Sequence, residues 1–166
     1  MDIVSLIKGT PLWVWGAFVY VVAVGVYFLQ DRTSSLRRLV MAPAVFIAWS
    51  LVSIEGHYGL TAYSVGMWLC GLAIGSFFGW IFSVAHPPRI VDKSKAVFIL
   101  PGSAAFLGIL LSFFLLRYIR GAVFSINPSL MQEPRIILLD LVFSGLLVGF
   151  LVGRVALYLN VYRKAK

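Results

Sequence analysis

The sequence has little charge and very few acidic residues. Charged residues make up 12% of its 166 positions, and six Asp and Glu stand against 14 Lys and Arg. A soluble domain has about 25% charged and about 45–50% apolar residues, whereas 61% of this chain is hydrophobic. A globule of this size has too small an interior for so much apolar surface, so most of the chain must face lipid. The composition predicts a single integral membrane domain over residues 1–166.

Cysteine and histidine are also scarce. The single cysteine, Cys70, lies inside an apolar run and excludes an internal disulfide. His57 and His86 fall in links expected on opposite faces of the membrane, so they would not share a metal or a haem. The sequence contains no Walker loop, no HExxH motif, no Ser-His-Asp set and no paired intramembrane carboxylates. We therefore expect no catalytic residues, no cofactor and no metal, and a protein that is not an enzyme.

Long apolar runs dominate the chain and predict an all-α membrane bundle of about five transmembrane helices. The runs cover residues 11–29, 39–54, 63–85, 103–119 and 136–159. The second run is short and contains Pro43, so it spans only with flanking residues or in a thinned bilayer. Residues 96–103 fit either a helix kinked at Pro101 or an extended segment that turns at Pro101-Gly102-Ser103 into the fourth helix. We favour the second interpretation, because Pro-Gly-Ser has turn and cap chemistry.

The positive charges lie in the loops, where they indicate membrane topology and not nucleic-acid binding. With five spans, one side of the membrane carries nine Lys and Arg: Arg32, Arg37, Arg38, Arg89, Lys93, Lys95, Arg163, Lys164 and Lys166. The other side carries four: Lys8, Arg117, Arg120 and Arg135. The positive-inside rule then predicts an outside N-terminus and a cytoplasmic C-terminus.

Glycine recurs at every fourth position in two of the apolar runs. These residues are Gly71, Gly75 and Gly79 in the third run, and Gly145, Gly149 and Gly153 in the fifth. Residues four apart share one helix face, so each triplet clears a flat strip about 12 Å long. In lipid the hydrophobic effect contributes little to helix association, and small residues let the backbones of two helices approach closely. The two ladders predict helix packing, either within one bundle or, for one ladder, against a second protomer.

Two charged residues lie inside the last run, and a charge at membrane depth marks a candidate functional site. Asp140 fits a cation or proton path, or else an ion pair with Arg117 at the end of the fourth run. Arg154 is expected about 9 Å of helix rise from the cytoplasmic boundary. Its long side chain can snorkel to the lipid headgroups over that distance, and the alternative is a bound anionic ligand.

Three short motifs mark the first and fourth predicted spans. The first span opens with Thr10-Pro11-Leu12-Trp13-Val14, Pro101-Gly102-Ser103 precedes the fourth, and Arg117-Tyr118 ends it. This pattern resembles a family of small multi-pass bacterial inner-membrane proteins of unknown function. The chain departs from it at Ala104-Ala105, where the family has an aromatic residue after Pro-Gly-Ser. The resemblance implies the bacterial inner membrane and supplies no activity, substrate or catalytic residue.

Three classes of function fit these observations. We favour a non-enzymatic accessory or scaffold protein that acts through helix packing, with the lipid bilayer and a homo-oligomer or membrane protein partner. The alternative is a small transporter or channel with Asp140 in the path. An intramembrane enzyme acting on lipid is supported only by the cationic cytoplasmic side with Arg154.

Overall fold

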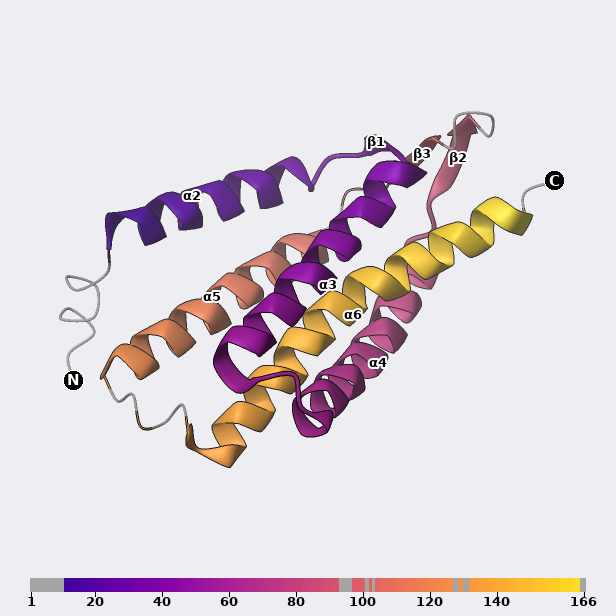
Figure 1. Cartoon of the computed structure of the whole chain (residues 1–166). Helices are drawn as coiled ribbons and strands as arrows, with labels where there is room; N and C mark the ends of the chain where they lie inside the picture. The colour runs from indigo at the N-terminus through magenta and orange to yellow at the C-terminus, as the bar shows by residue number, and fades with distance from the viewer. Residues whose placement is uncertain are drawn as a thin grey trace. The chain divides into compact units, whose positions relative to one another are not determined.

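The computed structural model describes residues 11–92, 97–100, 102, 104–126, 129 and 132–164. Of the residues considered above, those outside this part are Lys8, Thr10, Lys93, Lys95, Pro101, Ser103, Lys166 and the side chains of Trp13 and Ala105. The helices are α2 (Leu12–Tyr27), α3 (Leu36–Tyr58), α4 (Ala62–Ala85), α5 (Ala104–Ile126) and α6 (Pro134–Lys164) (Figure 1). The all-α fold class predicted from the apolar runs is confirmed.

Within the described residues, three helices, α3, α4 and α6, are long and apolar enough to cross a membrane. α2 is apolar but shorter, with 16 residues, and α5 is as long as α3, with 23 residues. The 31 residues of α6 extend over about 46 Å, whereas the hydrocarbon core of a bilayer is about 30 Å thick. α6 is therefore long enough to cross a membrane and to project beyond it.

The second apolar run forms a longer helix than its 16 residues indicate. α3 has 23 residues, because polar residues on both sides join the helix, and buried Pro43 lies within it. A proline there removes one backbone donor without ending the helix. α3 ends at Gly59, whose φ of +71° suits glycine and whose N–H donates to the Glu55 carbonyl. Thr61 and Ser64 then form a capping box that starts α4.

A three-stranded antiparallel sheet joins segments that lie far apart in the sequence. Its strands are β1 (Arg32–Ser35), β2 (Arg89–Asp92) and β3 (Val97–Leu100), in the order β1-β3-β2. β3 is the expected extended segment before α5, but β1 and β2 correct the expectation of plain polar loops. Strands of four residues are too short to show a clear alternation, and their pairing depends on contacts distant in sequence.

The chain divides into two compact units. The two-helix unit, residues 1–31 and 102–131, contains α2 and α5. Within it, the ring centroids of Phe18 and Phe114 lie 5.4 Å apart, and Gly25 lies against the Leu107 side chain. Asp31 Oδ1 accepts a 2.8 Å hydrogen bond from the Gly102 N–H, where the chain returns to this unit.

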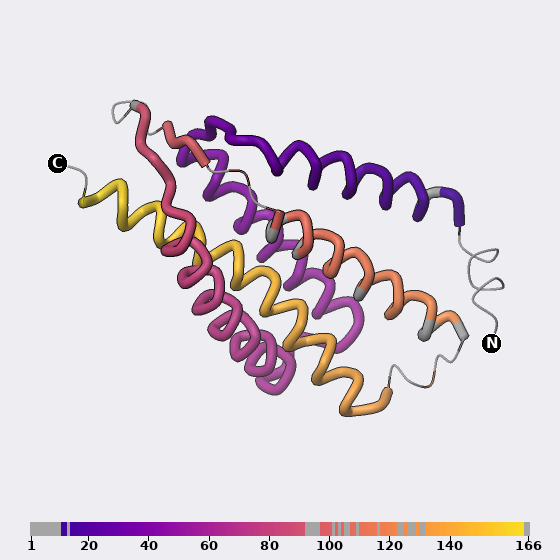
Figure 2. The backbone as a smooth tube through the Cα atoms, turned by 180° about the vertical axis from the view of Figure 1, so that it is seen from behind, coloured from indigo at the N-terminus to yellow at the C-terminus, as the bar shows by residue number. Residues whose placement is uncertain are grey.

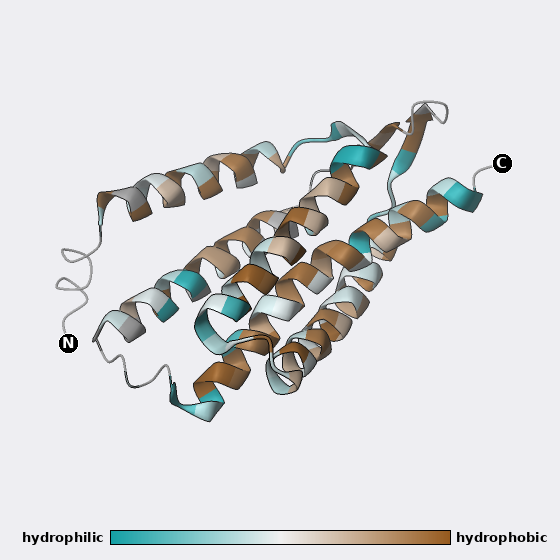
Figure 3. Cartoon of the chain, in the orientation of Figure 1, coloured by the Kyte–Doolittle hydropathy of each residue, from teal (hydrophilic) through white to brown (hydrophobic). Residues whose placement is uncertain are grey.

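The three-helix unit, residues 32–101 and 132–166, contains α3, α4, α6 and the sheet. Its core lies between the three helices and is formed by Ile54, Trp68, Leu141 and Val148. A second cluster joins the sheet to α6 through Phe98, Leu100 and Tyr158. Figure 3 shows apolar residues along these helices and polar residues gathered toward their ends.

Candidate functional site

The glycine ladders of α4 and α6 face each other within the three-helix unit. On α4, each glycine lies against a backbone carbonyl of α6: Gly71 against Val142, Gly75 against Leu146, and Gly79 against Phe150. On α6, the glycines lie against α4 carbonyls: Gly145 against Trp68, Gly149 against Leu72, and Gly153 against Ser76. Residue numbers rise together on both helices, so α4 and α6 run parallel, side by side in Figure 1 and in the reverse view of Figure 2.

These six positions, which we call the glycine contact, bring backbone against backbone. All six glycines are buried, and a Cβ atom at any of them would overlap the facing carbonyl oxygen. A carbonyl cannot turn aside as the end of a side chain can, so even alanine requires the helices to move apart. Cα–H groups that face carbonyl oxygens also form weak hydrogen bonds, which recur where helices pack closely. The ladders thus contact each other inside one chain.

Asp140 lies near one end of the glycine contact. Its Oδ2 accepts a 3.0 Å hydrogen bond from the Tyr58 hydroxyl of α3, and its side chain is half-buried. The sequence did not predict Tyr58 as its partner. Arg117, the partner expected from the sequence, belongs to α5 in the two-helix unit, where its guanidinium lies 5.7 Å from the Phe113 ring centroid. The ion pair between Asp140 and Arg117 stays a prediction.

A buried hydrogen-bond network links all three helices of the unit. Trp68 Nε1 of α4 donates to Ser50 Oγ of α3 over 2.8 Å, and Ser50 Oγ lies 3.1 Å from Ser144 Oγ of α6. Because an indole N–H can only donate, the Ser50 oxygen accepts that bond and its own hydrogen can point to Ser144. Ser50 and Trp68 are each 4% exposed. The one signal in the sequence was the spacing of Ser50, seven residues after Pro43 and four before Ile54, along the buried face of α3.

Two further serines of α4 have buried hydroxyl groups. Among the described residues, the hydroxyls of Ser76 and Ser83 are buried without a hydrogen-bond partner. The Ser76 backbone faces Gly153, and Ser83 lies one turn beyond Gly79 on the same face of α4. Their small side chains suit the close approach of the two helices.

Arg154 lies near the other end of the glycine contact, where α6 approaches the sheet. Its Nε and Nη2 donate to the Tyr158 hydroxyl oxygen over 3.2 and 2.8 Å. Its guanidinium lies 5.6 Å from the Phe82 ring centroid of α4 and 5.8 Å from that of Tyr158. Tyr158 is one turn closer to the C-terminus, so the guanidinium extends away from the middle of α6, as snorkelling requires.

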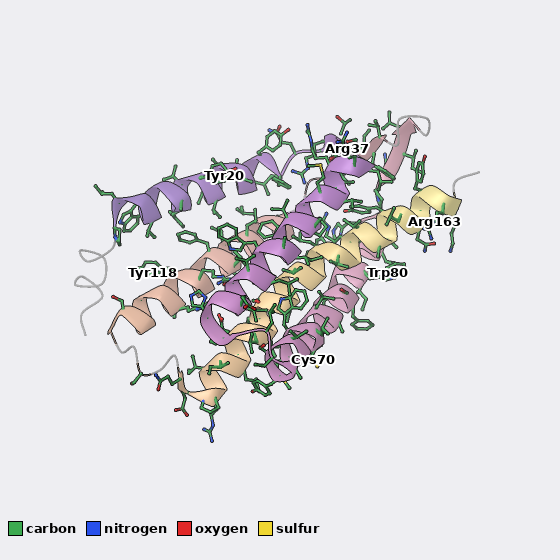
Figure 4. The ribbon with its side chains drawn as sticks, in the orientation of Figure 1. Tyr20, Arg37, Cys70, Trp80, Tyr118 and Arg163 are labelled. Carbon is green, nitrogen blue, oxygen red and sulfur yellow. The ribbon has the colours of Figure 1, made fainter. Side chains whose placement is uncertain are left out.

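The two histidines lie at opposite ends of α4. His57, in the last turn of α3, has Nδ1 2.8 Å from the Ser53 carbonyl, and His86, after α4, has Nδ1 3.2 Å from the Phe82 carbonyl. Cys70 is exposed on α4 (Figure 4). The described part of the chain holds no group of three or more His, Cys, Asp or Glu that could bind a metal ion.

Comparison with known proteins places the chain in one family. No curated protein and no solved structure matches it. A family model with the description "Family of unknown function (DUF6622)" matches residues 1–166. Because this match covers the whole sequence, the chain belongs to the family of unknown function DUF6622.

Proposed function

We propose that the protein is a non-enzymatic accessory or scaffold protein of a bacterial inner membrane that acts through helix packing. The observation that carries the proposal is the glycine contact, in which α4 and α6 meet backbone to backbone along three turns. Three apolar helices long enough to span a membrane support the location. A parallel pair locked in this way, with α3 bonded across it, is a rigid body on which a larger membrane assembly can form.

The outer face of α4, which is the side turned away from the glycine contact, supports the same proposal because it is apolar. Its large exposed side chains are Tyr63, Leu69, Ile74, Phe77, Phe78, Trp80, Ile81 and Val84. In a bilayer, such a face is matched by lipid chains or by the helix of a partner. One helix therefore presents a small-residue face to α6 and a bulky face to its surroundings.

Five spans with an outside N-terminus and a cytoplasmic C-terminus belong to the same proposal. The parallel run of α4 and α6 fits the third and fifth spans, and α3 runs antiparallel to α6, as a second span would. In a Cys70→Ala background, we expect Ser129→Cys to react with an impermeant thiol reagent on intact cells and Arg163→Cys to react only after lysis. The reverse pattern would contradict this orientation.

Native mass spectrometry of nanodiscs formed directly from bacterial membranes tests the scaffold role. Wild-type protein is expected to retain a second membrane protein, or further copies of itself, at fixed stoichiometry. Gly75→Leu is expected to lose this association, because leucine forces α4 and α6 apart. Gly66→Ala is the matched control, since a Cβ at Gly66 meets nothing within 4 Å. A wild-type monomer without partners, or equal retention by Gly75→Leu, would argue against a scaffold.

A transporter or channel is the second candidate, and the half-buried Asp140 favours it. Its carboxylate lies inside an apolar helix and bonds a tyrosine of the neighbouring helix, an arrangement that can hold a cation or pass a proton. In proteoliposomes, Asp140→Asn should abolish cation or proton flux and leave the melting temperature nearly unchanged. Glu55→Gln, an exposed carboxylate in the last turn of α3, should leave flux intact. Flux that is the same in wild type and Asp140→Asn would exclude this role.

A further inference from the structure

One end of the three-helix unit gathers positive charge from several elements. We call the three strands, the first turn of α3 and the last three turns of α6 the sheet end. Its described cations are Arg32, Arg37, Arg38, Arg89, Arg154, Arg163 and Lys164. Arg37 and Arg163, which come from opposite ends of the sequence, both lie at this end (Figure 4).

The opposite end of the same unit has the opposite balance of charge. It carries Glu55 in the last turn of α3, Glu133 before α6, and Asp140 in α6, with Arg135 as its described arginine. The Tyr58–Asp140 hydrogen bond shows that the end of α3 and the start of α6 lie together. Among its described residues, the sheet end contains one acidic residue, Asp92 of β2, against its seven cations. Charge is therefore polarised along the helices, and the cations of the sheet end are a local feature of the fold.

The sheet attaches this charge to the projecting part of α6. Phe98 is fully buried, and its ring centroid lies 6.4 Å from that of Tyr158 and 6.1 Å from that of Tyr162. Opposed residues of antiparallel strands share a face, so Arg89 and Ile99 lie on the face opposite to Phe98. That outer face carries the cationic Arg89 and the polar Thr33 beside the apolar Ile99, and surfaces that rest among lipid headgroups likewise combine cationic and apolar side chains.

The cations stand at two depths along α6. Arg154 lies nine residues before Arg163, which corresponds to about 14 Å of helix. The Arg163 side chain is exposed, whereas Arg154 is half-buried between α4 and α6, bonded to Tyr158 and beside Phe82. We call the exposed cations of the sheet end the outer cations; these are Arg37, Arg38, Arg89, Arg163 and Lys164. If the helices span a bilayer, the outer cations reach the headgroup surface, and Arg154 lies at the boundary between the headgroups and the hydrocarbon.

We propose that the sheet end binds the headgroups of anionic phospholipids. Arg154 contacts a lipid phosphate at the hydrocarbon boundary, Tyr158 positions its guanidinium, and the outer cations contact the surrounding negative charge. A guanidinium suits this role, because its planar fork of N–H donors matches phosphate oxygens. The partner is a lipid and not a nucleic acid, because the cations lie at the end of apolar helices. One of them, Arg154, also lies beside the aromatic rings of Phe82 and Tyr158. The inference goes beyond the scaffold role and does not depend on it.

The test compares lipid binding by native mass spectrometry in detergent, with phosphatidylglycerol and phosphatidylcholine at equal concentrations. Wild-type protein should prefer phosphatidylglycerol. Arg154→Gln should weaken phosphatidylglycerol binding about fivefold, the effect of one cation near an anionic membrane surface. Arg37→Gln/Arg38→Gln should weaken it by a larger factor. The matched control Arg135→Gln removes an exposed cation from the opposite end of α6 and should change nothing.

Two further variants separate lipid contact from structural effects. Arg154→Lys should keep more of the phosphatidylglycerol preference than Arg154→Gln does, and Tyr158→Phe should reduce it with the charge intact. If Arg154→Gln lowers the melting temperature, the double variant at exposed Arg37 and Arg38 carries the test alone. Equal wild-type affinity for the two lipids, an equal loss in Arg135→Gln, or tighter binding of single-stranded RNA than of phosphatidylglycerol would overturn the proposal.

Discussion

The two units each contain a helix pair, but the atoms that meet in the two pairs differ. α4 and α6 bring six glycines against backbone carbonyls, whereas α2 and α5 meet through side chains, with Gly25 facing the end of Leu107. A leucine side chain can rotate away from an added methyl group, and a helix carbonyl cannot. The comparison teaches that the importance of a glycine depends on the atom that faces it.

Other helical glycines in the chain face open space. A Cβ atom at Gly16, Gly66, Gly108 or Gly121 would meet nothing within 4 Å. These positions lie in helices with the same apolar character as the ladders. Substitution by alanine therefore separates glycines needed for close approach from those that only lower helix propensity.

The largest expected effect comes from breaking the glycine contact. Gly75→Ala or Gly149→Ala should each lower the free energy of unfolding by about 1–3 kcal/mol, because the added methyl group overpacks the contact. Thermal unfolding in detergent measures the loss. Gly66→Ala on the same helix should be neutral or stabilising by up to about 1 kcal/mol, since alanine has the higher helix propensity. Equal losses at Gly66 and Gly75 would show that the glycine contact does not hold the pair together.

The next effect concerns the polar network of the three-helix unit, in which Trp68 donates to Ser50. Ser50→Ala leaves the Trp68 N–H buried without its acceptor, which should cost about 1–3 kcal/mol of stability. Trp68→Phe in the Ser50→Ala background should then cost less than Trp68→Phe alone. The double-mutant cycle measures this coupling. Fully additive losses would mean that the indole and the serine do not depend on each other.

A smaller effect is expected at the end of α3. Tyr58→Phe removes the hydrogen bond to Asp140, and such bonds between membrane helices contribute about 0.6 kcal/mol on average. The melting temperature should fall slightly, and Tyr63→Phe, at a residue 49% exposed, should leave it unchanged. No difference between the two variants would place the stabilising partner of Asp140 elsewhere.

The helices and the shared face of each glycine ladder could be predicted, because their signals are local in the sequence. Apolar runs long enough to cross a membrane appear directly in the sequence, and a spacing of four on a helix fixes which residues share a face. The sheet could not be predicted, because Arg32 pairs with Leu100 across most of the first hundred residues. The bonds of Asp140 to Tyr58 and of Ser50 to Trp68 depend on the rotation of each helix against its neighbours, which no single helix specifies.

The smallest expected effect tests the other side of the comparison. In Gly25→Ala, the new methyl group meets the Leu107 side chain of α5, which can turn about 30° away from its rotamer at a cost of about 0.5–1.5 kcal/mol. Alanine recovers up to about 1 kcal/mol in helix propensity, so the two terms nearly cancel and the melting temperature should barely change. The measurement is the same thermal unfolding in detergent, with Gly75→Ala beside it. A loss at Gly25 as large as that at Gly75 would show that α2 and α5 are locked as tightly as α4 and α6, because the side chain at the contact would then be as immovable as a carbonyl.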